Sequence, residues 1–407
     1  MEYTNTYFDQ YLERRGSGSI KWDGCNEKFG VDTSEEMIPM WIADMDFRSP
    51  KEVIDAVEER AKSEAYGYTV KPDSFYESII RWVERRYHWE IKKDWIIFTP
   101  GVIPGFHIAI QSFTEPSDGI IVQTPVYYPF MDGVHSNRRM LVTNPLIEKN
   151  GDWFIDFDDL EKKVRNPKNK MMILSNPHNP VGRAWTGEEL RHLGDLCTDN
   201  GVLLISDEIH GDLMMKGAKH HAVCSVSERF KEHTITHYAP SKTFNLAGLQ
   251  TAYAVIPNDH IREAYIQGLN ANRIFNLNWF GAAALEAAYN KCDGYVDALC
   301  SYVDANMDYM RQFIDTRMPM LKMKKPEATY MAWVDFRGTG MSVEEIEHFI
   351  VHKAHIGVDM GRWFGEGGAG YLRFNLACPR CLLEKALKQL EEALAQKEVL
   401  VSMKELA

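Results

Sequence analysis

The chain has 407 residues, of which 45% are hydrophobic and 26% are charged, as in ordinary globular proteins. This length predicts two or three domains. Its 46 lysines and arginines face 58 aspartates and glutamates, and the net charge of −12 argues against binding to nucleic acid or to an anionic membrane.

The sequence carries no sign of export or membrane insertion. No hydrophobic run reaches the roughly 18 residues that a membrane-spanning helix needs. Residues 1–6 are polar and lack the basic and apolar regions of a signal peptide. The seven cysteines are scattered, without the spacing of a disulfide framework. These features predict a reduced, soluble protein of the cytoplasm.

The first 48 residues have no sustained periodicity and are interpreted as an extended arm. The string Ser49-Pro50-Lys51-Glu52 then predicts the start of a helix, because serine can cap it, proline suits its first position and glutamate completes a capping box. A second helix after Pro72 is predicted from the apolar face of Phe75, Ile79, Trp82 and Val83.

Short β-rich segments alternate with helical ones in the middle of the chain. The predicted strands are residues 95–98, 120–123, 171–175, 202–206, 234–238 and 251–256. One intervening helix spans residues 186–200, with Thr186 as its cap. The alternation predicts an α/β domain with a mostly parallel sheet, in which ligands bind beyond the carboxyl ends of the strands.

The chain after residue 290 predicts a second, smaller α+β domain. It contains predicted strands at residues 329–336 and 371–376 and a final helix with a leucine stripe, which is interpreted as core packing and not as a coiled coil. The predicted organisation is an N-terminal arm at residues 1–48, which belongs to the small domain, a large α/β domain at 49–290 and the small domain at 291–407.

Two motifs are rejected as independent sites. Residues 365–370 match G-x-G-x-x-G, but the string precedes a predicted strand where a dinucleotide motif would follow one, so an active-site loop is favoured. Cys378-Pro379-Arg380-Cys381 lacks a second ligand pair at the spacing of a zinc site, and we expect no metal.

Polar residues gather after four predicted strands. Thr99-Pro100-Gly101-Val102-Ile103-Pro104 leads into a helix, whose first amides favour a phosphate. Ser175-Asn176-Pro177-His178-Asn179-Pro180 is a stiff loop that can hold an amide side chain. Ser206-Asp207-Glu208 offers a carboxylate, and Ser241-Lys242 offers an amine beside a hydroxyl. Each could be an ordinary turn or surface residue, but an aldehyde cofactor with a phosphate needs the whole set.

With these strings the chain resembles the pyridoxal-phosphate enzymes of the aspartate-aminotransferase fold (fold-type I, class I/II) over nearly its whole length. The resemblance implies a mostly parallel, seven-stranded-type sheet, a smaller C-terminal domain and pyridoxal 5'-phosphate as cofactor. It implies that Lys242 is bonded covalently to the cofactor, that Asp207 pairs with the ring nitrogen and that Asn179 binds the phenolic oxygen. The other implied positions are Val102, Ile103 and Ser241 at the phosphate, Tyr127 stacked on the ring, and Ala43, Tyr127 and Arg373 at the substrate, with Arg373 on its carboxylate.

Two departures from the general aminotransferase pattern resemble a narrower subgroup. His210 stands where a tyrosine usually contacts the phenolic oxygen, and Gln250 stands where an arginine usually binds the phosphate. Both residues, together with the strings at 40–47 and 241–250, resemble the cystathionine β-lyase or cysteine-S-conjugate C–S lyase subgroup.

The resemblance implies a carbon–sulfur lyase that splits L-cystathionine or related cysteine S-conjugates to pyruvate, ammonia and a thiol by α,β-elimination. Lys242 would take the α-proton as general base. A class I/II aminotransferase stays open as an alternative, because the same residues serve it up to the loss of that proton. A third alternative is a pyridoxal-phosphate-binding regulator that acts through a protein partner.

Family analogy also implies a homodimer with shared active sites. Tyr68, in Tyr66-Gly67-Tyr68, would reach the cofactor's phosphate from the neighbouring subunit. The other expected partner is a small amino-acid substrate, whose distal half would contact the loops at residues 128–131 and 362–370.

Overall fold

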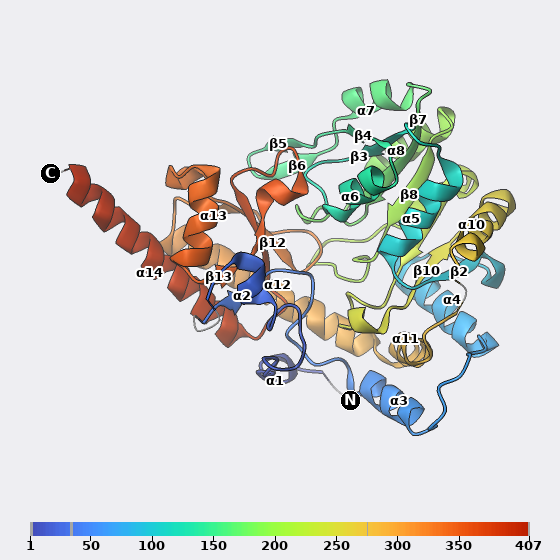
Figure 1. Cartoon of the computed structure of the whole chain (residues 1–407), viewed down its shortest axis with the longest axis horizontal. Helices are drawn as coiled ribbons and strands as arrows, with labels where there is room; N and C mark the ends of the chain where they lie inside the picture. The colour runs from blue at the N-terminus through green and yellow to red at the C-terminus, as the bar shows by residue number, and fades with distance from the viewer. Residues whose placement is uncertain (1–2, 33–35, 275, 406–407) are drawn as a thin grey trace.

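A mixed seven-stranded sheet lies in the right half of the computed structural model as drawn in Figure 1. The structure describes residues 3–32, 36–274 and 276–405. The strand order is β2-β10-β9-β8-β7-β3-β4. β10 runs antiparallel to both its neighbours, whereas the pairings from β9 to β4 are parallel. The prediction of a mostly parallel sheet is therefore confirmed. The strands are β2 (Ile96–Thr99), β3 (Gly119–Val122), β4 (Met140–Thr143), β7 (Asn169–Ser175), β8 (Leu203–Asp207), β9 (Thr234–Tyr238) and β10 (Ala252–Val255).

Helices cover both faces of this sheet. One face packs against α5 (Val102–Phe113), α6 (Pro129–Ser136) and α10 (Asp259–Ala271), and the other against α7 (Phe157–Val164) and α8 (Gly187–Asp199). Neighbouring residues of β3 divide between the two cores, because successive side chains of a strand point to opposite faces. Ile120 and Val122 lie in the first core and Ile121 lies in the second. The layers are those expected of an α/β domain.

Thr186 caps its helix as predicted from the sequence, whereas Ser49 does not. The Thr186 hydroxyl accepts a hydrogen bond from the Glu189 amide at 3.1 Å, and the Glu189 carboxylate accepts one from the Thr186 amide at 2.9 Å. The predicted capping box at Ser49 is wrong, because α3 (Lys51–Ala61) is preceded by Pro50 and has no side-chain cap. The Glu52 carboxylate instead accepts a hydrogen bond from the Tyr3 hydroxyl of the arm. A tertiary contact has replaced the local one.

A four-stranded antiparallel sheet follows in the C-terminal third, in the order β11-β12-β15-β14. Its strands are β11 (Lys322–Met323), β12 (Met331–Asp335), β14 (Asp359–Met360) and β15 (Tyr371–Asn375). The accompanying helices are α12 (Asp293–Arg317), α13 (Val343–His352) and α14 (Arg380–Glu405). The leucine stripe of α14 is buried, which confirms that it packs in the core; it consists of Leu383, Leu387, Leu390 and Leu394.

The N-terminal arm is more ordered than the sequence predicted. It contains the short helices α1 (Asn5–Phe8) and α2 (Cys25–Phe29), and its strand β1 (Ile38–Pro39) pairs in parallel with β13 (Ile356–Gly357). One hydrophobic cluster joins the arm to α4 (Asp73–Tyr87), α11 (Trp279–Lys291), α12 and the second sheet. Because this cluster crosses residues 48 and 290, the domain boundaries placed there stay predictions.

The remaining elements are the hairpin of β5 (Ile147–Lys149) and β6 (Asp152–Phe154) and the short helix α9 (Val223–Val226). Over the described ranges, none of the helices combines the length and the hydrophobicity that crossing a membrane requires.

Candidate active site

A pocket lies beyond the carboxyl ends of β7, β8 and β9, where α5 begins. Most of the residues that the sequence singled out line it, although they come from distant parts of the chain. They are Ala43, Val102, Ile103, Tyr127, Asn179, Asp207, His210, Ser241, Lys242 and Gln250. The fold therefore assembles one site from the separate strand-end strings, as the strand-end rule predicts.

Lys242 lies four residues after the end of β9, and its side chain is mostly buried. Its Nζ donates a hydrogen bond to the carbonyl oxygen of Ala43 at 2.7 Å. Burial, reinforced by the nearby Arg373 guanidinium, lowers the pKa of Lys242 to about 8. A large fraction of this amine is therefore neutral and nucleophilic at mildly alkaline pH.

Asp207 is the last residue of β8, and its side chain is buried. The Ile209 amide donates a hydrogen bond to Oδ1 at 3.1 Å. Burial nevertheless raises the pKa of Asp207 to about 7. A carboxyl group with this raised pKa would become fully ionised beside a cationic N–H group. Asp207 is therefore suited to pair with a protonated ring nitrogen.

The loop after β7 holds Asn179 in a fixed position. The hydroxyl of Ser175 donates to the carbonyl oxygen of Pro177 at 3.0 Å and accepts from the Asn179 amide at 3.1 Å. The carbonyl oxygen of Asn179 accepts from the Tyr127 amide at 3.1 Å. These contacts link the asparagine loop to the segment that carries the predicted stacking tyrosine.

Arg373 projects from β15 and is buried. One of its amino groups, Nη1, donates to Oδ1 of Asn179 at 2.7 Å, and Nη2 forms an ion pair with Asp359, its neighbour across the strand pair. Its Nε has no hydrogen-bond partner within the part of the chain that the structure describes. A buried cation with a donor to spare is suited to a substrate carboxylate.

His210 and Tyr127 line the same pocket as neutral groups. Burial, together with the charges of Lys242 and Arg373, lowers the pKa of His210 to about 3, so its imidazole is uncharged near pH 7. Its Nδ1 has no partner among the described residues. Burial raises the pKa of Tyr127, which keeps its phenol protonated. His210 can therefore supply a neutral donor or acceptor toward a ring oxygen.

The opposite end of the pocket is the N-terminus of α5. Gly101 precedes this 12-residue helix, and Val102 and Ile103 are its first two residues. Backbone amides at such a position attract phosphate. Lys242 is the one lysine or arginine among the residues that line the pocket. Phosphate binding here would therefore depend on these amides, on Ser241 and on Gln250.

Two predicted site residues, Arg373 and Tyr68, are not among those that line the pocket; Arg373 contacts the lining residue Asn179, whereas Tyr68 lies on the surface. The side chain of Tyr68 is 94% exposed. The prediction that it serves a neighbouring subunit is not tested by one chain and stays a prediction.

The glycine-rich string at residues 365–370 lies beside the pocket's aromatic segment. The Val126 amide donates to the carbonyl oxygen of Phe364 at 2.8 Å, and the Tyr128 ring makes edge contacts with the rings of Trp363 and Phe364. The two segments predicted to meet the distal half of the substrate therefore touch each other, although residues 129–131 form the start of α6 and not the predicted loop.

Asp359 is a charged residue near the site that the sequence did not predict. It lies on a two-residue strand, and its contact with Arg373 depends on pairing between β14 and β15. No local pattern in the sequence reports such a pairing. Ser175 was recognised only as part of a turn, although its hydroxyl fixes the asparagine loop.

Comparison with known proteins identifies what this chain resembles. The pattern of the family described as aminotransferase class I and II matches residues 35–390. The cystathionine beta-lyase PatB of Bacillus subtilis (strain 168) is 41% identical over 388 residues, which cover 95% of this chain and all of PatB.

Solved structures give the same result. Cystalysin from Treponema denticola, whose structure contains pyridoxal 5'-phosphate, superposes with a TM-score of 0.93 at 36% identity and covers 96% of this chain and 98% of its own. The pyridoxal-phosphate-bound C–S lyase from Staphylococcus hominis has a TM-score of 0.89 at 32% identity, covering 97% of this chain and 98% of its own.

Proposed function

The chain belongs to the aminotransferase class I and II family, and on that premise we propose that it is a pyridoxal-phosphate-dependent carbon–sulfur β-lyase. Its substrates are L-cystathionine or related cysteine S-conjugates, which it converts with one molecule of water to pyruvate, ammonia and a thiol. One observation carries the proposal: a chain that is 41% identical to a cystathionine beta-lyase places Lys242 and Asp207 in one pocket and holds Arg373 against Asn179 of the same pocket.

The residues of the pocket fit pyridoxal phosphate. Lys242 offers an amine whose pKa is lowered to about 8, and Asp207 offers a buried carboxyl that still needs a cationic partner. The N-terminus of α5 and Ser241 would hold the phosphate, and Asn179 and His210 would face the phenolic oxygen. When bound, the cofactor supplies an electron sink that stabilises negative charge on the substrate's α-carbon.

Lys242 is the residue that moves the α-proton in this proposal. Its neutral amine accepts the proton from the α-carbon at Nζ, and the carbonyl oxygen of Ala43 can receive a hydrogen bond from the resulting ammonium. The thiolate then leaves the β-carbon with the electron pair of the carbon–sulfur bond. The carboxyl group of Asp207 becomes negatively charged when it pairs with the ring nitrogen. This negative charge keeps the ring nitrogen protonated.

Arg373 orients the substrate in this scheme. Asn179 and Asp359 hold its guanidinium from two sides, and the remaining donor faces the substrate carboxylate. A planar fork that is held in this way binds a carboxylate in one orientation, which points the α-hydrogen toward the amine.

The test is thiol release from L-cystathionine by the unaltered chain and by Lys242→Ala. We expect the variant to lose at least about 1000-fold in kcat, since the proton transfer that Lys242 performs is no longer available. Circular dichroism is the control for folding. A folded Lys242→Ala variant that released thiol at the unaltered rate would remove this residue from the reaction.

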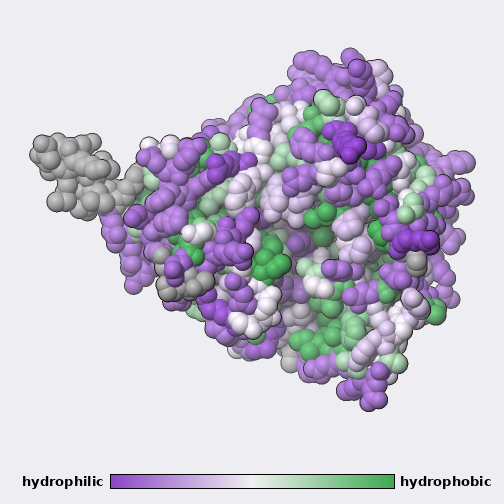
Figure 2. Space-filling model, viewed as in Figure 1, coloured by the Kyte–Doolittle hydropathy of each residue, from purple (hydrophilic) through white to green (hydrophobic). Residues whose placement is uncertain are grey.

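We further propose that the enzyme is a homodimer in which Tyr68 completes the neighbour's site. Tyr66, Tyr68 and Val70 expose large side chains on the segment between α3 and α4. Figure 2 shows hydrophobic residues exposed on the lower half of the face in view. Exposed apolar surface of this kind is typical of a protein–protein contact, and a two-fold contact places the same segment against the partner twice.

Mixing two inactive variants tests the shared site. Tyr68→Ala and Lys242→Ala homodimers should each be impaired, whereas random exchange of subunits gives hybrids with one intact site and about a quarter of the unaltered activity. Sedimentation of each variant checks that dimers persist. If the mixture regains nothing while subunits exchange, Tyr68 does not act across the dimer.

We also propose that the protein works in the reducing cytoplasm. All seven cysteines are free in the structure, and six of them are at least partly buried. Free thiols in this number are typical of proteins from a reduced compartment.

A further inference from the structure

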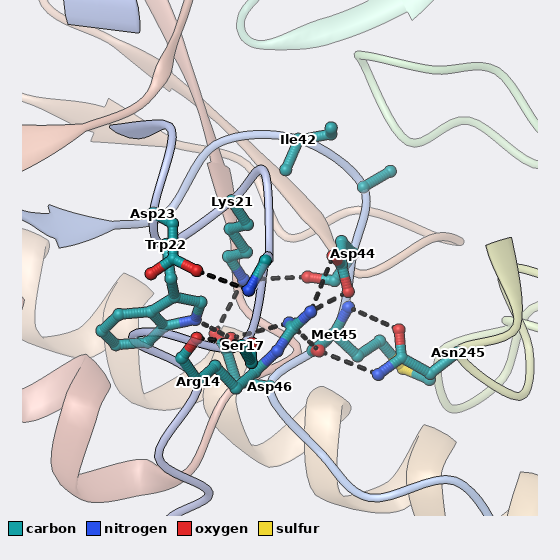
Figure 3. A network of polar contacts seen from close by, with 12 residues as sticks. Arg14, Ser17, Lys21, Trp22, Asp23, Ile42, Asp44, Met45, Asp46 and Asn245 are labelled. Atoms are coloured by element: carbon teal, nitrogen blue, oxygen red, sulfur yellow. Dashed lines mark hydrogen bonds and ion pairs between the residues drawn. The ribbon is translucent and has the colours of Figure 1, made fainter. Parts of the chain in front are cut away.

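We propose that five residues of the N-terminal region, here called the arm cluster, are positioning residues for the catalytic amine. The arm cluster comprises Arg14, Lys21, Trp22, Asp44 and Asp46. Figure 3 shows how these residues hold the turn at residues 42–46. The carbonyl oxygen of Ala43 in this turn accepts a hydrogen bond from Nζ of Lys242. The inference rests on the proposed function, which makes Lys242 the base.

The centre of the arm cluster is a buried ion pair. Lys21 is 0% exposed, and its Nζ donates to Oδ2 of Asp46 at 2.7 Å and to the carbonyl oxygen of Asp44 at 2.8 Å. The indole Nε1 of Trp22 donates to the other oxygen of Asp46, also at 2.7 Å. Each of these contacts joins residues 21–22 of the arm to residues 44–46 of the turn.

Arg14 binds the same turn on its more exposed side. Its two amino groups donate to the two carboxylate oxygens of Asp44, each at 3.0 Å, and Nη1 also donates to the carbonyl oxygen of Met45 at 2.8 Å. This bidentate arrangement fixes orientation as well as distance.

Two asparagines anchor the turn to the rest of the site. Asn375 follows the substrate arginine on β15, and its Nδ2 donates to the carbonyl oxygens of Ile42 and Asp44 at 2.9 Å and 2.8 Å. Asn245, three residues after Lys242, donates to the carbonyl oxygen of Met45 at 2.9 Å. The turn is therefore fixed relative to both Lys242 and Arg373.

The backbone of the turn is strained where it enters the pocket. Ile42 has a φ of 43°, in the left-handed region that a β-branched residue rarely adopts. Strain of this kind persists only when surrounding contacts hold it, and it gathers at functional positions. Burying an ion pair is also a poor route to stability alone. The two observations together favour a positioning role over a merely structural one.

Four charged side chains influence Lys242 from the elements around it. Asp44 of the turn, Asp207 of β8 and Asp359 of β14 favour its protonated form, whereas Arg373 of β15 disfavours it. His210 is neutral near pH 7 because burial lowers its pKa to about 3. Of the three acids, Asp44 is the one that the arm cluster holds in place.

The experiment compares two variants with one control. Lys21→Met/Asp46→Asn removes the buried ion pair without changing net charge, and Asp44→Asn removes the partner of Arg14 at a more exposed position. Lys325→Met is the control, since it breaks an ion pair with Asp304 and Asp308 on α12 and lines no part of the pocket. Each chain, depleted of cofactor, is acetylated competitively at a series of pH values, and the peptide with Lys242 is quantified by mass spectrometry. The Tm, kcat and KM of each loaded enzyme are measured alongside.

We expect the labelling pKa of Lys242 to fall by about one pH unit in both variants, because its ammonium loses a fixed acceptor, and in Asp44→Asn also a nearby negative charge. The kcat should fall about 10- to 100-fold with a smaller change in KM, as expected for a misplaced base. Lys325→Met should lower the Tm alone.

Unchanged Lys242 labelling in the folded variants would overturn the positioning role, even if the Tm had fallen. If the double variant does not fold, Asp44→Asn decides by the same readout. A chain without lyase activity whose Lys242 labelling shifts as expected would refute the proposed function and support only the part of this inference that concerns the placement of the Lys242 amine.

Discussion

The cationic side chain of Arg373 lies close enough to the pocket to act on Lys242, and only one of these two groups keeps its full charge. Arg373 keeps its charge beside the Asp359 carboxylate. Lys242 has no carboxylate partner within hydrogen-bond distance among the described residues, and burial together with Arg373 lowers its pKa to about 8. The residue that we propose as nucleophile and base is therefore the one that gives up its proton more readily.

We expect the cofactor-free chain to capture pyridoxal phosphate faster as pH rises, with the rate levelling off above about 8. The pKa of Lys242 lies below its ordinary value of 10.5, and the neutral amine that attacks forms above the pKa. The change in cofactor absorbance reports the rate. Arg373→Gln should move the midpoint to higher pH, because it removes a neighbouring positive charge. A midpoint near 10.5 in the unaltered chain would contradict this account.

Arg373→Ala should weaken substrate binding more than it slows turnover. Removing one partner of a buried, charge-assisted contact reduces kcat/KM by roughly 100-fold, mainly through KM. Steady-state kinetics on L-cystathionine measure both constants. A substrate analogue without the carboxylate serves as control, since it should be insensitive to the change. Equal losses with both compounds would place Arg373 outside the carboxylate site.

Among the residues of the site, the sequence predicted those at the ends of strands. It did not predict those that reach the site through contacts between distant segments of the chain. Lys242 and Asp207 follow recognisable strands, and the pocket contains both. Asp359 and the arm cluster reach the site through contacts between residues far apart in the chain. Such contacts leave no periodicity or spacing that a single sequence reveals.

Among the elements, the starts of α8 and α3 show how tertiary contacts override a local signal. Both sequences offer a hydroxyl residue followed three positions later by glutamate, but only Thr186 forms the capping box. At Ser49 the arm intervenes, because the Tyr7 hydroxyl donates to the Ser49 carbonyl oxygen at 2.7 Å and Tyr3 donates to Glu52. The same sequence pattern therefore forms a helix cap only where no distant segment forms hydrogen bonds with its polar groups.

Thr186→Ala should lower the free energy of unfolding by about 1 kcal/mol, the usual effect of losing a helix cap. Ser49→Ala is the matched comparison and should change it by less than half of that, since its side chain caps no helix. Urea denaturation of both variants measures the difference. A larger loss at Ser49 than at Thr186 would contradict the assignment of the two caps.

For the whole molecule, the sheet of the large α/β region was predictable and much of the C-terminal sheet was not. The six predicted strands of the central sheet each end within two residues of the observed bounds. They are segments of four to seven residues, most of them apolar, whose signal is local. The seventh strand, β4 at the edge of the sheet, was not predicted. β11, β13 and β14 have two residues each, and their existence depends on distant partners, such as β1 for β13. Local sequence patterns therefore predicted most strands of the central sheet. The contacts between the N-terminal arm and the rest of the chain could be found only in the structure.

The most direct test of the central claim is whether the loaded enzyme needs a 2-oxo acid. One reaction contains L-cystathionine alone, and the other contains an amino acid with 2-oxoglutarate; pyruvate, thiol and glutamate are followed in both. The account predicts thiol and pyruvate in equal amounts from L-cystathionine without any oxo acid. Glutamate formation in the second reaction, with no thiol in the first, would contradict it and make the protein an aminotransferase.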